Sequence, residues 1–272
     1  MLIACKQKDT PTVKEDIVVT DTDTSETSND TLTIVPDFEL TETKKPVFFD
    51  YTSTGCPGCG SWGAPTFEQI AKEQGESIVP IAVHIKYGDP MITDVSNAIA
   101  ENRTGQRYTP QLWVNNTNGM VLNGGSINTT GSITKITADL ETIKTEAPEM
   151  AIGVGSIVNG DIFKVRYKSK VLADITGEYY LAIYLMEDGI LYRQSSAATN
   201  PFEHNYVIRK SNGGGFGSQI SQDELTKNNT ITGTVEFEID PNWNKEKLSA
   251  TAIIWKKEGT NYNIINANSN NL

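Results

Sequence analysis

Histidine, cysteine and long apolar runs are all scarce in this sequence. Its 272 residues include 2 histidines and 3 cysteines, which leaves few side chains that could ligate a transition metal. No run approaches the roughly 20 apolar residues with which an α-helix spans a bilayer. Basic residues are outnumbered, because 23 lysines and arginines stand against 34 aspartates and glutamates, and the formal net charge is −11. Phosphate binding needs a cationic surface, so this charge argues against a nucleic-acid partner.

The first five residues, MLIAC, end in Cys5 after a short apolar run. This pattern resembles the lipobox of bacterial lipoproteins, in which the cysteine is lipid-modified and becomes the first residue of the mature chain. Residues 9–44 are dominated by Thr, Asp, Ser and Glu, and such a segment buries too little apolar surface to offset its ordering entropy. We therefore expect residues 1–44 to form a flexible tether. With a lipid anchor at Cys5, the protein would belong to the cell envelope. A free thiol at the start of a soluble protein is the alternative.

A regular apolar pattern begins at Val47. The short apolar run 47–51 indicates a strand, and Phe67, Ile70 and Ala71 after it show helical spacing. This order of a strand, a helix and a further strand requires a parallel pair of strands with a crossover helix. The further predictions are a turn followed by a helix within 56–75, a strand at 77–85, a helix at 90–102, a hairpin of 111–115 and 119–123 with its turn at 116–118, and a helix at 132–147 capped by Ser132.

Two of the three cysteines form the motif CPGC at 56–59, where the first predicted strand meets the first predicted helix. A cysteine pair at this point resembles the thioredoxin fold. That family has a buried carboxylate six positions before the first cysteine, where this chain has Asp50. It also has a cis-proline before the third strand, where this chain has Thr109 and Pro110. The resemblance covers residues 46–146. It departs from the family in the glycine that replaces the usual tryptophan before the first cysteine, and in the order Pro-Gly between the cysteines.

The resemblance implies thiol–disulfide chemistry. Cys56 would cap the helix, where the exposed amides of the first turn and the helix dipole stabilise a thiolate and lower the pKa of the thiol. Cys59, one turn further on and more buried, would resolve the mixed disulfide. Asp50 would have a pKa raised by desolvation and would shuttle the proton of Cys59. Thr109 and Pro110 would hold the backbone of the partner in an extended conformation.

Other interpretations of these residues stay open. A permanent disulfide between Cys56 and Cys59 would close a very short loop and stabilise the fold little. A zinc site would need both histidines or carboxylates in addition to the two cysteines. Asp50 could be a buried acid that only hydrogen-bonds a hydroxyl such as that of Thr52. His84, within a predicted strand, is expected to be a packed and hydrogen-bonded residue.

Beyond the proline of EAPEM at 146–150, the apolar period changes from helical to alternating. Six or seven short strands over about 120 residues indicate an immunoglobulin-like β-sandwich. His204 and Arg209 are expected to be a loop histidine and a strand charge. The predicted strands are 163–168, a hairpin within 178–192 that turns at 188–189, 234–240, and a terminal hairpin of 248–256 and 262–269.

Three stretches of this second half resemble one family. HNYVIRK at 204–210, DPNWNKEKLSATAIIW at 240–255 and IINA at 264–267 follow a thioredoxin-like unit. Together they are similar to a family of outer-membrane lipoproteins named for a twenty-eight-kilodalton antigen of Gram-negative anaerobes. Tyr206 stands where the pattern of that family has a second histidine. The resemblance implies a protein that contains both domains and is lipid-anchored in the outer membrane of the cell envelope, either in the periplasm or on the surface.

The sequence thus predicts an α/β plus all-β protein. Its parts are a tether at 1–44, a thioredoxin-like domain at 45–147 and an immunoglobulin-like β-sandwich at 148–272. Two functions remain open. The first is a thiol–disulfide oxidoreductase that acts on envelope proteins carrying thiols or disulfides. The second is a non-catalytic surface lipoprotein that binds a protein or a glycan. We expect no cofactor, no metal ion and no nucleic-acid partner in either case.

Overall fold

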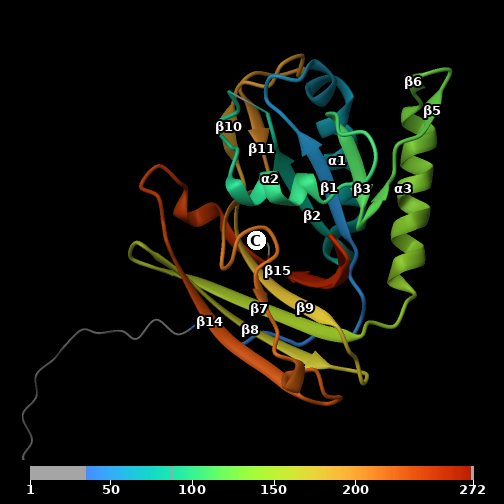
Figure 1. The fold of residues 1–272 in the computed structure, drawn as a ribbon. Helices are drawn as coiled ribbons and strands as arrows, with labels where there is room; N and C mark the ends of the chain where they lie inside the picture. The colour runs from blue at the N-terminus through green and yellow to red at the C-terminus, as the bar shows by residue number, and fades with distance from the viewer. Residues whose placement is uncertain (1–34, 87, 271–272) are drawn as a thin grey trace, which may run out of the picture. The chain divides into compact units, whose positions relative to one another are not determined.

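Strands form most of the regular structure, and one mixed sheet organises it (Figure 1). The computed structural model describes residues 35–86 and 88–270, so the predicted lipidation site Cys5 lies outside the described residues. The main sheet has the strand order β16-β15-β9-β12-β2-β1-β3-β4. These strands are β1 (Val47–Thr52), β2 (Val79–His84), β3 (Gln111–Val114), β4 (Thr117–Asn118), β9 (Glu178–Glu187), β12 (Val207–Ser211), β15 (Leu248–Glu258) and β16 (Asn261–Ser269).

The first half of the chain contains the predicted parallel pair. β1 and β2 are parallel, which confirms the prediction of a crossover helix between them. That crossover is a π-helical turn at Cys59–Gly63 followed by α1 (Ala64–Gln74). α1 and α3 (Thr129–Lys144) pack on one face of the sheet. α2 (Asp94–Glu101) packs on the other face.

β1 is buried on both of its faces, and this explains why its sequence is almost continuously apolar. Phe48 packs into the apolar cluster that contains Phe67 of α1. Its neighbours Phe49 and Tyr51 point to the opposite face of the sheet, where they join a second cluster. Asp50 therefore shares the face of Phe48 and lies on the side of α1, which is also the side of the cysteine motif.

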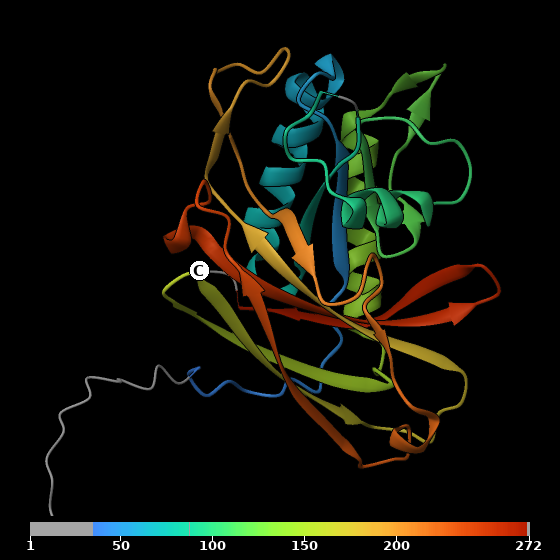
Figure 2. The same cartoon turned by 60° about the vertical axis from the view of Figure 1, so that its left-hand side comes forward.

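The second half adds a three-stranded antiparallel sheet, in the order β14-β8-β7. Side chains of β7 and β8 pack with side chains of β9 and β15 in one apolar cluster, so this sheet lies over one end of the main sheet (Figures 1 and 2). The remaining strands are β7 (Met150–Asn159), β8 (Ile162–Val171), β14 (Thr230–Glu238), β13 (Ser218–Gln219), which pairs with β9, and the small pairs β5 (Leu122–Asn123) with β6 (Ser126–Ile127) and β10 (Ile190–Tyr192) with β11 (Phe202–His204).

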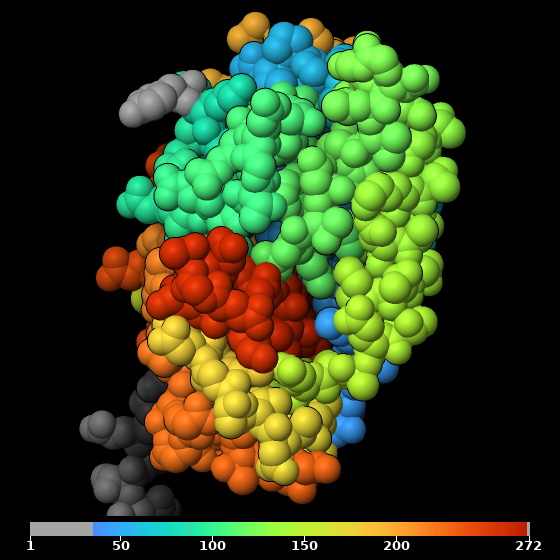
Figure 3. Space-filling model, turned by 45° about the vertical axis from the view of Figure 1, so that its right-hand side comes forward, coloured from blue at the N-terminus to red at the C-terminus, as the bar shows by residue number. Residues whose placement is uncertain are grey.

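The main sheet continues from the first half of the chain into the second. β12 pairs in parallel with β2 through Val207 and Ala82. One apolar cluster contains side chains from both halves, such as Tyr51 and Trp255. The terminal hairpin lies against the green segments of the first half in Figure 3. The side-chain nitrogen Nδ2 of Asn102, in the first half, donates to the carbonyl of Tyr262 in this hairpin at 2.7 Å. The boundary between residues 147 and 148 falls between α3 and β7 and stays a prediction, since the described residues belong to one compact unit.

Two details predicted for the end of the first half are wrong. The strand that pairs with β3 is 117–118, because Asn115 takes a left-handed φ of 48° and turns the chain earlier than expected. The helix α3 begins before Ser132, which had been expected as its cap. Asn128 is the cap instead, and its side-chain oxygen accepts a hydrogen bond from Gly131 N at 2.9 Å.

The hairpin predicted within 178–192 is also wrong. β9 pairs with β12, β13 and β15, whereas β10 pairs with β11. The side chain of Asp188 accepts a hydrogen bond from Tyr206 N, which places the start of β12 beside β9 where a return strand would lie. His204 was expected in a loop, but it belongs to β11 and is buried.

The predicted tether ends earlier than residue 44. Val35 is buried, and Thr41 forms an antiparallel bridge with Ile152 of β7. A side chain on Gly153 would collide with the backbone of Glu39, since the added carbon would lie 2.5 Å from its carbonyl oxygen. Residues 35–44 are therefore packed along β7, and the rest of the predicted tether lies outside the described residues.

Candidate active site

The cysteine motif lies at the carboxyl end of β1, where the chain turns into the helix. Cys56 directly precedes the helical segment, which begins at Pro57. The backbone N–H of Cys59 donates to the sulfur of Cys56 at 3.2 Å. This is the bond that a helix cap forms with the third residue of the first turn. The turn that follows is π-helical, a local geometry that is frequent at functional sites.

Cys56 differs from Cys59 in exposure and in charge. Both cysteines are free thiols, and Cys56 is partly exposed whereas Cys59 is buried. A hydrogen bond from Cys59 lowers the pKa of the Cys56 thiol to about 5, against the opposing effect of partial burial. Smaller contributions in the same direction come from the Cys59 amide, which donates to the sulfur, and from the charge of Lys86. At neutral pH Cys56 is therefore a thiolate, the form that attacks disulfides.

Cys59 and Asp50 form a buried acid pair beneath the reactive sulfur. Cys59 is 0% exposed, and the hydrogen bond to Cys56 together with burial raises its pKa. Asp50 is 2% exposed, and burial followed by repulsion from the Cys56 thiolate raises its pKa to about 8. A hydrogen bond with Thr52 opposes this rise in the pKa of Asp50. Neither group is fully ionised at neutral pH, so a proton can be held at either one.

Thr109 and Pro110 lie against the helix start, and the peptide bond between them is cis. The sulfur of Cys56 is 3.5 Å from the carbonyl oxygen of Thr109. A side chain on Gly63 would collide with Pro110, since its first carbon would lie 2.6 Å from Pro110 Cβ. All five predicted site residues are thus brought together. Their roles stay a prediction.

Sequence reasoning missed Gln194, which comes from the segment between β10 and β11. Its side-chain Nε2 donates to the carbonyl of Ser53 at 3.2 Å and to that of Cys56 at 3.1 Å. The neighbouring Ser195 N donates to Thr54 O at 2.8 Å. In Figures 1 and 2 this amber segment reaches the start of the blue helix. A lone glutamine in a loop has no periodicity or motif that could have revealed the contact.

We expect Gln194→Ala to lower the free energy of unfolding by about 1–3 kcal/mol, because the buried carbonyl of Ser53 and the partly buried carbonyl of Cys56 lose a shared donor. The measurement is urea unfolding of the reduced full-length protein. Gln219→Ala is the matched control, since Gln219 is exposed and its loss should change the stability by less than about 0.5 kcal/mol. Equal stability of the two variants would show that the bonds of Gln194 are not needed to hold the cysteine loop.

Two buried histidines lie close to this site. His84 Nδ1 is 2.8 Å from Asp89 Oδ2 and the ring is 1% exposed, which confirms His84 as a packed, hydrogen-bonded residue. Its ring centroid lies 5.4 Å from that of His204. Burial, and then the neighbouring His84, lowers the pKa of His204 to about 4. No group of three His, Cys, Asp or Glu side chains in the described part of the chain is arranged to hold a metal ion.

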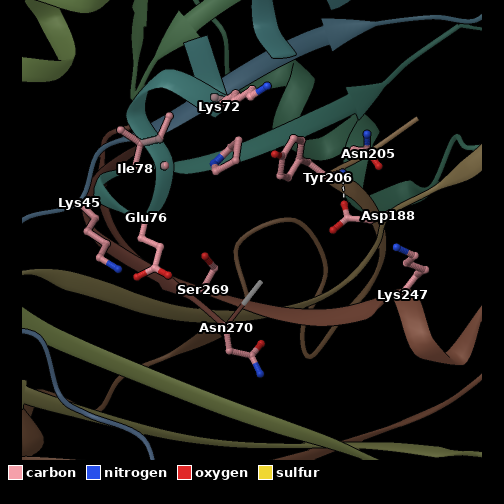
Figure 4. A pocket seen from close by; sticks show the side chains of 13 residues that line it. Lys45, Lys72, Glu76, Ile78, Asp188, Asn205, Tyr206, Lys247, Ser269 and Asn270 are labelled. Carbon is pink, nitrogen blue, oxygen red and sulfur yellow. Dashed lines mark hydrogen bonds between the residues drawn. The ribbon is translucent and has the colours of Figure 1, made fainter. Parts of the chain in front are cut away.

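A hollow of about 580 Å³ lies away from the cysteines, where the end of α1 faces the end of β16. Figure 4 shows Lys45 and Glu76 on one side of it and Asp188 and Lys247 on the other. Its lining is mostly polar and includes Tyr206. None of the five predicted site residues lines it, so a ligand in this hollow would not contact the cysteines.

No protein-family model matches this chain, and a search of curated proteins finds no match. Among solved structures, the fold is similar to that of HBP35 of Porphyromonas gingivalis. The TM-score is 0.66 at 16% sequence identity, over 86% of this chain and 77% of that one. A domain of the outer membrane lipoprotein Omp28 from Porphyromonas gingivalis aligns over 43% of this chain and 96% of its own. Its TM-score is only 0.29, at 16% identity. The first similarity shows a shared fold, and the second carries no argument about this chain.

None of the helices within residues 35–86 and 88–270 is both long and apolar enough to cross a membrane.

Proposed function

We propose that this protein is a thiol–disulfide oxidoreductase of the cell envelope. Its first half would be a thioredoxin-like unit and its second half an immunoglobulin-like sandwich. The observation that carries the proposal is the environment of Cys56. Its sulfur caps a helix and accepts a hydrogen bond from the backbone N–H of Cys59 at 3.2 Å, and the pKa of the thiol is lowered to about 5. A structural disulfide needs none of these features.

The first chemical step is an attack by the Cys56 thiolate on one sulfur of a client disulfide. A sulfur–sulfur bond forms between Cys56 and the client, the client disulfide breaks, and its other sulfur leaves as a thiolate that takes a proton from water. Partial exposure gives Cys56 access to the client. The carbonyl of Thr109, at 3.5 Å from Cys56, borders the path along which the client backbone would lie.

The second step transfers a proton from Cys59 to the Asp50 carboxylate. The Cys59 thiolate then attacks the sulfur of Cys56, a Cys56–Cys59 disulfide forms, and the second client sulfur leaves as a thiolate. The client is thereby reduced by two electrons and the protein is oxidised by two. In reverse, the same steps oxidise a client dithiol. A pKa near 8 lets Asp50 accept the proton and release it again near neutral pH.

We also propose that the chain is a lipoprotein that is anchored through Cys5 in the outer membrane. The lipobox-like start and the Thr- and Asp-rich segment after it support this location. The clients would then be envelope proteins that carry thiols or disulfides.

Cys59→Ser tests this function, because it removes the thiol that resolves the mixed disulfide. We expect full-length Cys59→Ser protein in cells to accumulate disulfide-linked adducts with envelope proteins, visible on non-reducing gels and lost on reduction. The control is the double variant Cys56→Ser/Cys59→Ser, which keeps Cys5. Adducts of equal amount in both variants would come from Cys5, and either that outcome or a lack of adducts would contradict the proposed function.

The hollow of about 580 Å³ favours a second candidate, a non-catalytic lipoprotein that binds a glycan. The aromatic ring of Tyr206 and the charged side chains of Lys72 and Glu76 are suited to a sugar ring and its hydroxyls. This candidate predicts that the Cys56→Ser/Cys59→Ser protein binds a glycan on an array, and that Tyr206→Ala weakens this binding at least about tenfold. Binding that depends on the cysteines, or no binding at all, would contradict it.

A further inference from the structure

A small cavity lies between α1, the sheet and the β10–β11 pair. About 10 Å³ of it is open to the centre of a water molecule, roughly the room that one water needs. Both halves of the chain contribute to its walls. Its polar lining consists of Asp50, Thr52, Glu68, His84, Gln194 and His204, together with Asn205.

Three buried polar atoms of this lining have no hydrogen-bond partner among the described residues: Asp50 Oδ1, His84 Nε2 and His204 Nε2. The exposure of these residues is 2%, 1% and 5%. The second nitrogen of His84 is engaged by Asp89, and His204 hydrogen-bonds the backbone of Tyr192. Buried polar atoms left unpaired cost free energy, so three of them around one cavity need a common partner.

We propose that one water molecule occupies this cavity and joins Asp50 to the His84–His204 pair. His204, from the second half of the chain, thereby acts as a positioning residue for the proton acceptor of the redox site. This inference rests on the proposed function. It also gives β10 and β11 a part in that function, because they place His204 beside a carboxyl group of β1.

Such a water can hydrogen-bond Asp50 in both of its protonation states. When the acid is neutral, its O–H donates to the water, and the two hydrogens of the water donate to the two free Nε2 lone pairs. When the acid is ionised, the water turns and donates one hydrogen to Asp50 Oδ1 and the other to one histidine, and the Nε2 of the other histidine is left without a donor. In both states Nδ1–H of His84 donates to Asp89. Although burial opposes it, the bonds from His84 and from two backbone amides hold the pKa of Asp89 below its usual range.

The water favours the ionised form of Asp50, because a buried carboxylate oxygen without a donor costs more free energy than a neutral acid or a single histidine nitrogen without a partner. A dry cavity would therefore leave less carboxylate to accept the proton of Cys59. The groups around Asp50 are Cys56 and Cys59 at the helix start, Glu68 of α1, His84 of β2 and His204 of β11, with Asp89 behind His84. Among these, only the two histidines offer unpaired acceptor nitrogens toward the cavity.

His204→Phe in the full-length protein tests the role of this water, because a phenyl ring fills the cavity and accepts no hydrogen bond. The readout is the rate at which the mixed disulfide with a fluorescent peptide is resolved, followed against pH. We expect a loss of about tenfold at pH 7 that is recovered as the pH rises, since the midpoint of the profile shifts upward by about one unit. His204→Gln keeps an acceptor and should lose less.

Phe202→Leu is the matched control, since Phe202 packs on His204 at a centroid distance of 5.0 Å but offers no acceptor. If its profile shifts as that of His204→Phe does, the effect is one of packing and this inference is wrong. A wild-type protein that forms no mixed disulfide would refute the proposed function instead.

A crystal structure of the reduced wild-type protein tests the water itself, whatever the activity. We expect density for one atom within about 3.2 Å of Asp50 Oδ1, His84 Nε2 and His204 Nε2. Anomalous scattering from a metal at that position, or an empty cavity, would overturn the inference.

Discussion

Replacement of Cys56 by serine is expected to lower the rate of thiol–disulfide exchange about a thousandfold or more. A serine hydroxyl is not ionised near neutral pH, so the nucleophile is lost. Cys59 cannot replace it, because it is fully buried and its pKa is raised by the bond to Cys56 and by burial. The measurement is a single-turnover reaction of the reduced protein with a peptide disulfide.

Cys59→Ser is the matched variant for this experiment. It keeps the attacking thiol and supplies a hydroxyl donor in place of the Cys59 thiol, whose hydrogen bond contributes most to the lowered pKa of Cys56. We expect it to attack the peptide disulfide once and to stop at the mixed disulfide. If both variants were equally inactive, or if Cys56→Ser formed the adduct through Cys59, the assigned order of the two thiols would be wrong.

Replacement of Asp50 by asparagine is expected to slow the reaction and, at the same time, to stabilise the fold. It should slow the resolution of the mixed disulfide about a hundredfold, because the carboxylate that accepts the proton of Cys59 is gone. It should also raise the free energy of unfolding at pH 7 by about 4 kcal/mol. This second figure follows from the difference between an ordinary pKa of 3.8 and a folded-state pKa of about 8.

The pH dependence gives this prediction its sign. Because the pKa of Asp50 is raised in the folded state, its stabilising contribution is complete below about pH 4 and is lost as the pH rises through 8. The wild-type protein should therefore lose stability relative to Asp50→Asn over this range, in urea unfolding at a series of pH values. Asp37→Asn removes the same charge from an exposed position and should leave the pH profile unchanged. Parallel profiles for all three proteins would place Asp50 in a polar, hydrated setting.

The parts of the fold that the sequence predicted are those that depend on local pattern. The apolar run of β1 and the helical spacing of Phe67, Ile70 and Ala71 were enough to predict a parallel pair with a helical crossover, which is confirmed. The motif at 56–59 and the positions of Asp50 and Pro110 pointed to a single site, and the structure does bring these residues together.

The parts that escaped prediction depend on contacts between distant residues. Gln194 binds a carbonyl 141 residues earlier in the chain, and no local pattern encodes that distance. β12 enters the sheet beside β2 because Asp188 holds the amide of Tyr206, whereas the Asp-Gly turn alone favoured a simple hairpin. The composition of residues 35–44 predicts a tether, because it does not reveal that β7 supplies the surface on which these residues pack.

The pH dependence of alkylation at Cys56 tests the central claim most directly. Reduced full-length protein is treated with iodoacetamide at a series of pH values, and the peptide that contains Cys56 is quantified by mass spectrometry. We expect the alkylation rate to reach half its plateau near pH 5, because the hydrogen bonds from Cys59 favour the thiolate. A midpoint near the ordinary cysteine pKa of about 8.5 would show that the helix start does not activate this sulfur. The proposed oxidoreductase function would then be wrong.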